Sequence, residues 1–336
     1  MDRGEDNLVA WLAERYGANG IGHHLTGGAS SASADGGVVL GLGDDMAWVA
    51  GGGEGILLTV DMLMDGIHFD STAVGPEKIG RKALAVSLSD CAAMAVRPCY
   101  VVVSVALPEA WSMAQAQALF LGMEPLAEAF GCAIIGGDTN SWSAPLVVDV
   151  TLAARPYAGV PPVRRNGARP GDELWVTGRL GGSLRGHHLT FQPRVVEAHR
   201  LACLFGDSLR AMMDLSDGLS TDAPRMAKAS GCGLMLDVAA LEHVASEAAS
   251  DAARDDGGSV MDHVLNDGED FELFFAASPG AMERLQAAST EQTDSGTPPL
   301  KMCSRVGVAV EGEGVWLRAA DGARQPIQPR GWQHFR

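Results

Sequence analysis

The sequence predicts a two-domain α/β (α+β) fold in which each half mixes strands with helices. The chain has 336 residues, and at roughly 100–200 residues per domain this length suggests two domains. Short β-branched runs alternate with longer helical patterns in both halves. A break containing Pro161, Pro162 and Pro170 falls at residues 158–172. We therefore place an N-terminal domain at 1–158 and a C-terminal domain at 159–336.

The N-terminal domain is expected to combine strands and helices in alternation. Apolar, β-branched runs predict strands at 38–40, 56–60, 100–106 and 146–152. Apolar periodicity predicts helices at 6–16, 76–94 and 112–130. Pro76 suits the first turn of its helix, and the Gly/Ser/Ala-rich residues 27–37 predict a loop.

The C-terminal domain repeats this mixture. The same criteria predict strands at 174–177, 212–215, 234–237, 271–276 and 306–310. They predict helices at 194–204, 218–229 and 279–287. Residues 246–259 and 289–299 are expected to be exposed and disordered.

The charge balance argues against several classes of partner. The net charge is −17 and no Lys/Arg cluster offers a surface for a phosphate backbone, so we expect no nucleic-acid partner. An acidic membrane surface would repel the chain. No apolar run approaches the ~20 residues of a membrane helix, and the first residues lack an apolar signal region. The six scattered cysteines favour core residues in a reducing cytoplasm over a zinc site.

Short acidic motifs at the ends of apolar segments are the strongest functional signal. They are Gly43-Asp44-Asp45, Val60-Asp61, Ser89-Asp90, Gly136-Gly137-Asp138, Asp214-Leu215-Ser216-Asp217-Gly218 and Asp267-Gly268-Glu269-Asp270. Any one of them could be a turn or a helix cap. Aspartate is a poor strand former and is costly to bury. Six such motifs together favour a shared binding role.

Asp90 is the most informative of these acids. The helical residues 83–94 around it are apolar on nearly all sides, so the helix and the carboxylate are expected to be buried. No Lys or Arg stands one turn before or after Asp90. A buried carboxylate is paired, binds a metal or stays protonated, and a metal ion is therefore the favoured partner.

An oxygen-rich site of this kind suits Mg²⁺, Mn²⁺ or Ca²⁺. The residues after Asp214 lack the EF-hand spacing, whereas Mg²⁺ commonly binds a few carboxylates together with substrate phosphates. The common phosphate-binding loop and the protein-kinase motifs are absent from the sequence. Residues 41–46 begin like a dinucleotide fingerprint, but Met46 stands where the third glycine belongs.

These acids belong to a longer series of motifs in fixed order. Further members are Asp61-Met62-Leu63-Met64-Asp65-Gly66-Ile67-His68-Phe69, Lys82-Ala83-Leu84-Ala85-Val86-Ser87-Leu88-Ser89-Asp90, Ile135-Gly136-Gly137-Asp138-Thr139, Arg165-Asn166-Gly167 and Gly331-Trp332-Gln333-His334-Phe335. The series resembles the thiamine-monophosphate kinase family over about residues 5–335. Single motifs occur across the wider aminoimidazole-ribonucleotide-synthetase superfamily. His68-Phe69 and the C-terminal tail are similar to this kinase specifically.

The resemblance implies a dimer formed through the N-terminal sheets, with ATP bound near the dimer interface together with several Mg²⁺ ions. The metal ligands that it implies are Asp45, Thr59, Asp61, Asp90, Asp138, Asp214 and Asp217. The implied ATP contacts are Gly137, Asp138, Arg165 and Ser216. The implied substrate contacts are His68, Glu269 and Trp332.

The resemblance also implies a function: phosphorylation of thiamine monophosphate by ATP in a cytoplasmic homodimer. The acceptor oxygen is already anionic and needs no strong base, so no catalytic side chain is assigned. Metal ions and Arg165 would neutralise the phosphates. Another ATP-using member, such as an aminoimidazole-ribonucleotide-synthetase-like ligase, and a non-catalytic Mg-nucleotide-binding protein are the alternatives.

The sequence departs from the family pattern at two places. Val60 stands where the family often has Thr, and the segment after Gly178 is short. Three of the implied contacts could instead have a purely structural role. His68 could be a surface residue at a strand end, Arg165 a surface residue at a turn, and Trp332 an anchor of the C-terminus.

Overall fold

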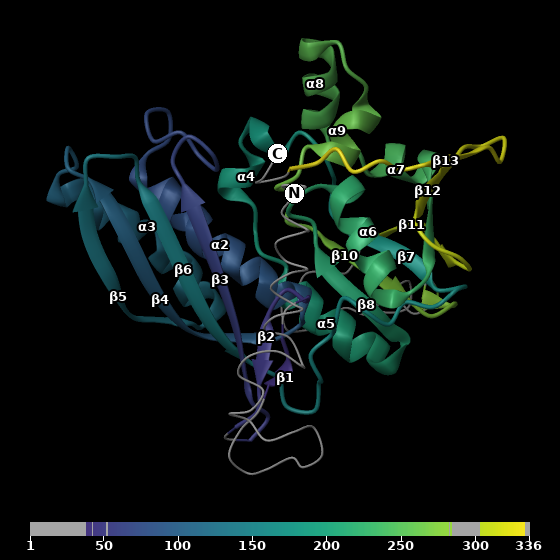
Figure 1. Ribbon diagram of the computed structural model, residues 1–336, viewed down its shortest axis with the longest axis horizontal. Helices are drawn as coiled ribbons and strands as arrows, with labels where there is room; N and C mark the ends of the chain where they lie inside the picture. The colour runs from purple at the N-terminus through teal and green to yellow at the C-terminus, as the bar shows by residue number, and fades with distance from the viewer. Residues whose placement is uncertain (1–37, 42, 52, 282, 284–302, 333–336) are drawn as a thin grey trace, which may run out of the picture.

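The computed structural model describes residues 38–41, 43–51, 53–281, 283 and 303–332. Two β-sheets stand side by side with helices packed on them, and helix α2 lies between them (Figure 1). The predicted α/β fold is therefore confirmed. The helix predicted at 6–16, the loop at 27–37, the segment at 289–299 and most of the helix at 279–287 lie outside the described residues.

The first sheet has the strand order β1-β2-β3-β6-β4-β5. Its strands are β1 (Val38–Leu40), β2 (Ala47–Val49), β3 (Ile56–Met64), β4 (Arg97–Pro108), β5 (Ala133–Trp142) and β6 (Val147–Arg155). Strands β4 and β5 run parallel, and the other neighbours run antiparallel. Helices α2 (Pro76–Ala93) and α3 (Met113–Phe130) cover one face of this sheet (Figure 1).

Local sequence explains where these two helices begin, end and cross. Helix α2 begins at Pro76, and α3 begins with a capping box between Ser112 and Gln115. Glycines allow the two helices to approach closely. A Cβ atom on Gly80 would lie 1.8 Å from the Leu119 carbonyl oxygen, and one on Gly122 would lie 1.9 Å from that of Glu77. Any larger residue would push α2 away from α3.

The second face of the first sheet carries apolar side chains that no described helix covers. Along β3, Leu57 and Leu63 are buried beneath α2, whereas Val60 and Met62 on the opposite face are 61% and 56% exposed. This alternation is the period-two pattern of a strand. Exposed Tyr100, Val102 and Ile135 on β4 and β5 add to the apolar surface. A bare apolar sheet face is typical of an interaction surface.

The second sheet has the strand order β13-β12-β9-β11-β7-β10-β8. Its strands are β7 (Glu173–Thr177), β8 (Leu209–Asp214), β9 (Gly233–Asp237), β10 (Leu273–Ala277), β11 (Cys303–Val310), β12 (Val315–Arg318) and β13 (Arg324–Pro326). Its helices are α4 (His187–Thr190), α5 (Val195–Phe205), α6 (Leu219–Ser230), α7 (Val238–Val244), α8 (Glu247–Asp256) and α9 (Val260–Asn266), with 3₁₀ turns η2 (Ser183–Arg185) and η3 (Gly206–Ser208).

Both faces of the second sheet are buried, each in a different core. Val176 and Phe274 pack with α6 and α9 in a core of the C-terminal half. Trp175 and Phe275 on the other face join α5 and the core beneath the first sheet. Helix α2 packs against β3 and β6 on one side and against α5 and β8 on the other. It therefore positions side chains at the junction of the two sheets.

Several elements differ from the sequence-based predictions. Strand β5 was not predicted, because Gly136, Gly137 and Asp138 are poor strand formers. Residues 246–259, predicted to be disordered, contain helix α8 instead. The Ser246 hydroxyl accepts a hydrogen bond from the Ala249 amide, Gly257 adopts the left-handed conformation at the end, and the helix buries Ala249 and Ala253. The two buried alanines are four residues apart, so their helical spacing, rather than the overall hydrophobicity of the segment, explains this helix.

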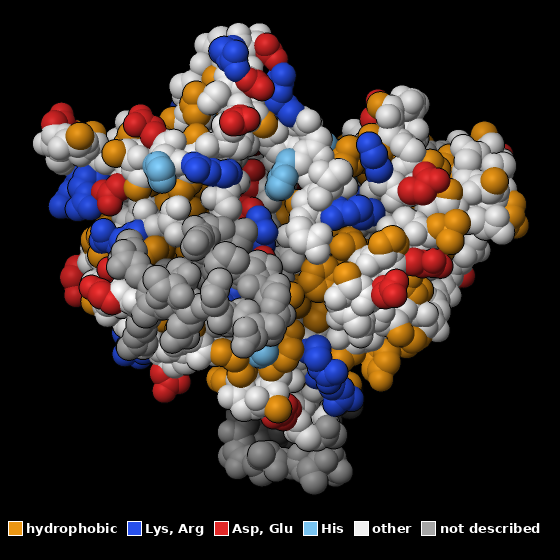
Figure 2. Space-filling model, turned by 180° about the vertical axis from the view of Figure 1, so that it is seen from behind, with side chains coloured by type: hydrophobic (Ala, Val, Ile, Leu, Met, Phe, Trp, Pro, Cys, Tyr) orange, Lys and Arg blue, Asp and Glu red, His pale blue; other side chains and the backbone are white. Residues whose placement is uncertain are grey.

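Within the described ranges, no helix combines the length and the apolar character needed to cross a bilayer. On the face seen in Figure 2, Lys and Arg side chains are interspersed with acidic and apolar ones.

Candidate active site

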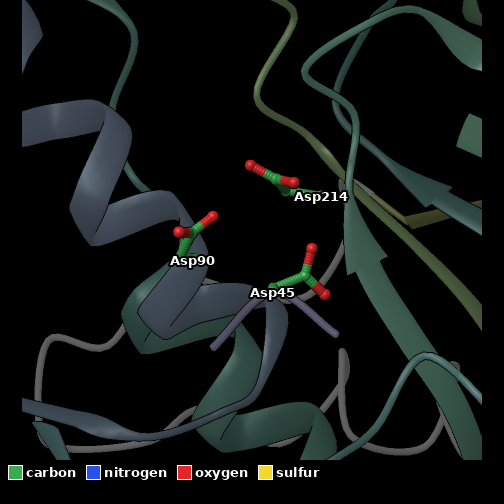
Figure 3. Close-up of side chains that lie close together, drawn as sticks. All are labelled: Asp45, Asp90 and Asp214. Carbon is green, nitrogen blue, oxygen red and sulfur yellow. The ribbon is translucent and has the colours of Figure 1, made fainter. Parts of the chain in front are cut away.

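Three carboxylates from three elements converge at the junction of the two sheets. Asp45 lies in the turn before β2, Asp90 in the last turn of α2, and Asp214 at the end of β8. One oxygen atom of each lies within 4.8 Å of the others. Figure 3 shows the three side chains facing a common space. The fold therefore brings together acids that are separated by up to 169 positions in the sequence (214 − 45).

Hydroxyl groups on β3 and on α2 hold these acids in place. The Thr59 hydroxyl donates a hydrogen bond to Asp90, and the Ser89 hydroxyl donates one to Asp214 at 2.5 Å. Ser87 donates to Asp61 at 2.7 Å. Thr59 and Asp61 lie on the face of β3 that α2 covers, because they are two residues apart. These bonds orient the carboxylates but cannot neutralise their charge.

The environment of the acids raises their pKa values. Burial, followed by the Asp45 carboxylate, raises the pKa of Asp214 to about 7. Burial is also the main cause that raises the pKa of Asp61 to about 6. The pKa of Asp90 lies well above its usual value through burial and repulsion from Asp61 and Asp214. Asp90 keeps some contact with solvent, whereas full burial was expected. Such a group of acids favours a bound cation.

Arg165 reaches into the same group. Its Nη2 atom donates to Asp45 at 2.6 Å, and its backbone amide donates to Asp44 at 3.1 Å. It is therefore an enclosed residue of the site, and the surface alternative is wrong. The second Asp45 oxygen is buried without a hydrogen-bond partner in the part of the chain that the structure describes. This orphaned oxygen and the converging acids fit a hard divalent cation.

Asp217 lies beside this group in a separate ionic cluster. Arg225 pairs with Asp217 at 2.5 Å and with the fully buried Asp222 at 2.9 Å. The Asp217 carbonyl oxygen accepts a hydrogen bond from the backbone amide of Trp332 at 3.1 Å. A Cβ atom on Gly331 would lie 1.9 Å from that oxygen, so glycine allows the C-terminal segment to pass close to the site. Trp332 itself remains 41% exposed.

Lys82, which was not assigned from the sequence, joins His68 and Glu269. The Lys82 ammonium donates to both Glu269 oxygens, at 2.7 and 2.9 Å, and to the His68 carbonyl oxygen at 2.5 Å. The Glu269 amide in turn donates to the Ser216 carbonyl oxygen at 2.7 Å. These contacts connect the turn after β3, helix α2 and the two acidic loops of the C-terminal half.

Gly137 and Asp138 are not brought to the three carboxylates within this chain. The register runs from Asp138 on β5 across Ser104 and Asp149 to Met62 on β3, so three strand spacings separate Asp138 from β3. Asp138 is exposed and accepts hydrogen bonds from the Thr139 amide and the Asn140 side chain. Gly137 is required for packing, because a Cβ atom there would lie 1.8 Å from the Val103 carbonyl oxygen.

Comparison with known proteins places this arrangement in a family. The model for the N-terminal domain of AIR synthase related proteins matches residues 43–155. The thiamine-monophosphate kinase of Rhodopirellula baltica is 36% identical over 305 residues, which cover 88% of this chain and 92% of the relative. This chain belongs to the thiamine-monophosphate kinase family.

Solved structures of this family share the fold. One, described as AaThiL complexed with AMPPCP and TMP, has a TM-score of 0.77 and 26% identity, with 99% of this chain and 97% of that chain covered. The thiamine-monophosphate kinase of Stenotrophomonas maltophilia K279a has a TM-score of 0.68 and 31% identity, with 85% of this chain and 91% of that chain covered.

Several residues around the site of this thiamine-monophosphate kinase family member were not assigned from the sequence. Asp44, Ser87 and Ser89 stand inside the quoted motifs, and their partners become visible only in three dimensions. Lys82 could have been found as the charged residue that directly precedes the apolar run 83–88 of α2. Arg225 lies eight positions after Asp217, and no simple spacing would have indicated their pairing.

Proposed function

We propose that this protein transfers the γ-phosphoryl group of ATP to the phosphate of thiamine monophosphate, with bound Mg²⁺, giving thiamine diphosphate and ADP. The observation that carries the proposal is the convergence of Asp45, Asp90 and Asp214 in a member of this kinase family. A family member solved with an ATP analogue and thiamine monophosphate supports both substrates.

The metal sites would be formed by the acids around the junction. Asp45, Asp90 and Asp214 would share Mg²⁺ with Asp61 and Thr59. Asp217 would serve as a further ligand beside them. When bound, the ions would neutralise the phosphates of the two substrates.

In the transfer step, a phosphate oxygen of thiamine monophosphate would attack the γ-phosphorus in line. The new P–O bond forms as the bond to the bridging oxygen of ADP breaks, and ADP carries away the electron pair. The attacking oxygen is already anionic, so no side chain needs to remove a proton. Arg165, which reaches Asp45, and Ser216 would contact the ATP phosphates.

Substrate binding would involve residues on both sides of α2. The His68 Nδ1 atom accepts a hydrogen bond from the Met64 amide at 3.0 Å, so the proton of the neutral ring resides on Nε2. That N–H group could donate to a phosphate. Glu269 and Trp332 would contact the thiamine rings, where an aromatic face stabilises the cationic thiazolium.

A homodimer formed through the open apolar face of the first sheet is part of the proposal. Asp138 shares this face with Met62, because paired residues on neighbouring strands point to the same side. Dimerisation would therefore place Gly137 and Asp138 in the interface, where they could complete the ATP site of the partner. This arrangement would explain why one chain alone does not bring Asp138 to the other acids.

We also propose that the chain forms two domains, at 1–158 and 159–336, because the two sheets fall on either side of this boundary. A cytoplasmic location completes the proposal. The cysteines are all free within the described residues, as in a reducing compartment.

A product assay tests the reaction. Purified protein is incubated with thiamine monophosphate and Mg-ATP, and the products are separated by chromatography. Equal amounts of thiamine diphosphate and ADP are expected, and EDTA should abolish both. Release of ADP without thiamine diphosphate would indicate a different acceptor and would overturn the proposed function.

A further inference from the structure

Lys82 has an environment that a solvent-exposed lysine does not have. Its side chain is fully buried in α2. An ammonium group has three N–H donors, and the structure provides three acceptor atoms: two on Glu269 and one on the His68 backbone. Burial lowers the pKa of Lys82, and the Glu269 carboxylate opposes this shift. A lysine is costly to bury unless its charge is fully paired.

The two partners of Lys82 belong to segments held in defined conformations. Glu269 has a φ angle of +51°, which is unfavourable for a residue with a Cβ atom, and Phe271 has +50°. Such conformations persist where surrounding contacts enforce them, and they cluster at functional sites. On the other side, the turn after β3 is closed by hydrogen bonds from the Ile67 and His68 amides to the Met64 carbonyl oxygen.

We propose that Lys82 is a positioning residue for substrate selection. It holds the Glu269 carboxylate and the turn that contains His68 at a fixed distance from each other. This inference rests on the proposed function, in which His68 contacts the phosphate and Glu269 the thiamine end of one substrate. A single ammonium group bonded to both segments sets the distance between those two contacts. Lys82 itself is fully buried and acts through its two partners.

The ion pair also determines how Glu269 recognises its ligand. Lys82 and Glu269 together carry no net charge, so Glu269 offers a cationic ring little uncompensated charge. Its side chain is 19% exposed while both oxygens bind Lys82. The remaining lone pairs of a carboxylate can accept further hydrogen bonds. Glu269 would therefore accept a hydrogen bond from an N–H group of the substrate, such as the amino group of the pyrimidine ring.

Steady-state kinetics of the full-length enzyme test the proposal. K82M should raise the KM for thiamine monophosphate by about 10-fold, the factor that corresponds to ~1.4 kcal/mol. The KM for ATP should change by less than about two-fold, because the hydrogen bonds of Lys82 within the described residues go to His68 and Glu269 and not to a residue proposed for ATP. The matched control is K78M, which removes an exposed lysine one turn earlier in the same helix. It should leave both constants unchanged.

A double variant separates positioning from folding. K82M alone leaves the Glu269 carboxylate partly buried and unpaired, whereas K82M/E269Q removes both charges. If Lys82 acts through Glu269, the double variant should be no worse in KM than the poorer single variant. Additive effects of the two substitutions, or an equal rise in both KM values for K82M, would overturn the proposal.

Amide hydrogen exchange provides a readout that does not depend on turnover. K82M should speed exchange both at residues 66–68 and at residues 269–271, because Lys82 joins these two segments, and K78M should speed neither. Faster exchange at only one segment would show that Lys82 does not couple them. If the wild type makes no thiamine diphosphate but K82M affects both segments, the proposed function fails while the positioning role stands.

Discussion

Hydrogen bonds to individual oxygen atoms determine how the cluster of carboxylates at the junction of the two sheets is oriented. The hydroxyls of Thr59, Ser87 and Ser89 each direct one acid, and Arg165 reaches one oxygen of Asp45 while the other oxygen has no partner among the described residues. A hydroxyl donor does not neutralise the negative charge of a carboxylate, so the clustered carboxylates can still bind a cation.

Removing one acid should abolish most of the turnover. D61N and D90N should each lower kcat by at least about 100-fold, because each removes a ligand from a charge-neutralising ion. The fold should survive, since each change also removes a carboxylate that its neighbours repel. Turnover and circular dichroism across a Mg²⁺ titration measure both effects. The control is D251N, at a half-exposed acid on α8. Near-wild-type turnover of both site variants at limiting Mg²⁺ would contradict the metal assignment.

Trp332 distinguishes stacking on the substrate from anchoring of the chain end. If it stacks on thiamine, W332A should raise the KM for thiamine monophosphate by about 5–30-fold, as ~1–2 kcal/mol implies. W332F should recover much of the loss. W316A, at a tryptophan of β12 in the second sheet, is the control. A lower melting temperature with unchanged substrate constants would show that Trp332 only anchors the C-terminal segment.

At the scale of elements, β3 and its neighbouring strands form the open apolar face through which we expect two chains to associate. The structure places Val60 on the open face of β3, opposite Asp61. V60T should therefore leave activity within a few-fold, because the side chain does not face the carboxylates. V60K should introduce two buried charges across a two-fold interface and break the dimer.

Light scattering at micromolar concentration measures this prediction. Wild type and V60T should show about twice the chain mass of 35.0 kDa, and V60K should show that of one chain. The turnover of V60K should also fall, because Asp138 of one chain would no longer reach the proposed ATP site of its partner. A wild-type monomer that retains full activity would remove both the dimer and the shared-site proposal.

The sequence predicted strongly periodic elements well and weakly periodic ones poorly. The helices predicted at 76–94 and 112–130 correspond to α2 and α3 within one residue at each end. Strand β5 and helix α8 were missed, since β5 contains glycines and Asp138, and α8 buries mainly small alanines. The acids Asp45, Asp90 and Asp214 were predicted to act together, and they converge. The Lys82–Glu269 pair depends on packing between the two halves, which no local pattern encodes.

At the scale of the whole molecule, the raised pKa values couple folding to pH. Asp61 and Asp214 have folded-state pKa values of about 6 and about 7, above the usual 3.8. Between about pH 4 and pH 7 the folded state therefore binds more protons than the unfolded state, and stability falls as pH rises. The net charge of −17 acts in the same direction through self-repulsion.

Magnesium should oppose this trend. The ion binds deprotonated acids, so millimolar Mg²⁺ should raise the melting temperature more at pH 8 than at pH 5. Without metal, the melting temperature should fall from pH 5 to pH 8, and D214N should flatten this slope. Differential scanning fluorimetry with EDTA or Mg²⁺ measures both effects. Equal stabilisation by Mg²⁺ at both pH values would mean that these acids do not bind it.

Helix α2 contacts both sheets, and its residues share one continuous core with α5, Trp175 and Phe275. We therefore expect the two proposed domains, on either side of residue 158, to unfold together. Calorimetry should show a single heat-absorption peak whose van't Hoff and calorimetric enthalpies agree for the dimer. A half expressed alone would expose the apolar surface that α2 normally covers, so neither half should be recovered as a soluble, folded fragment.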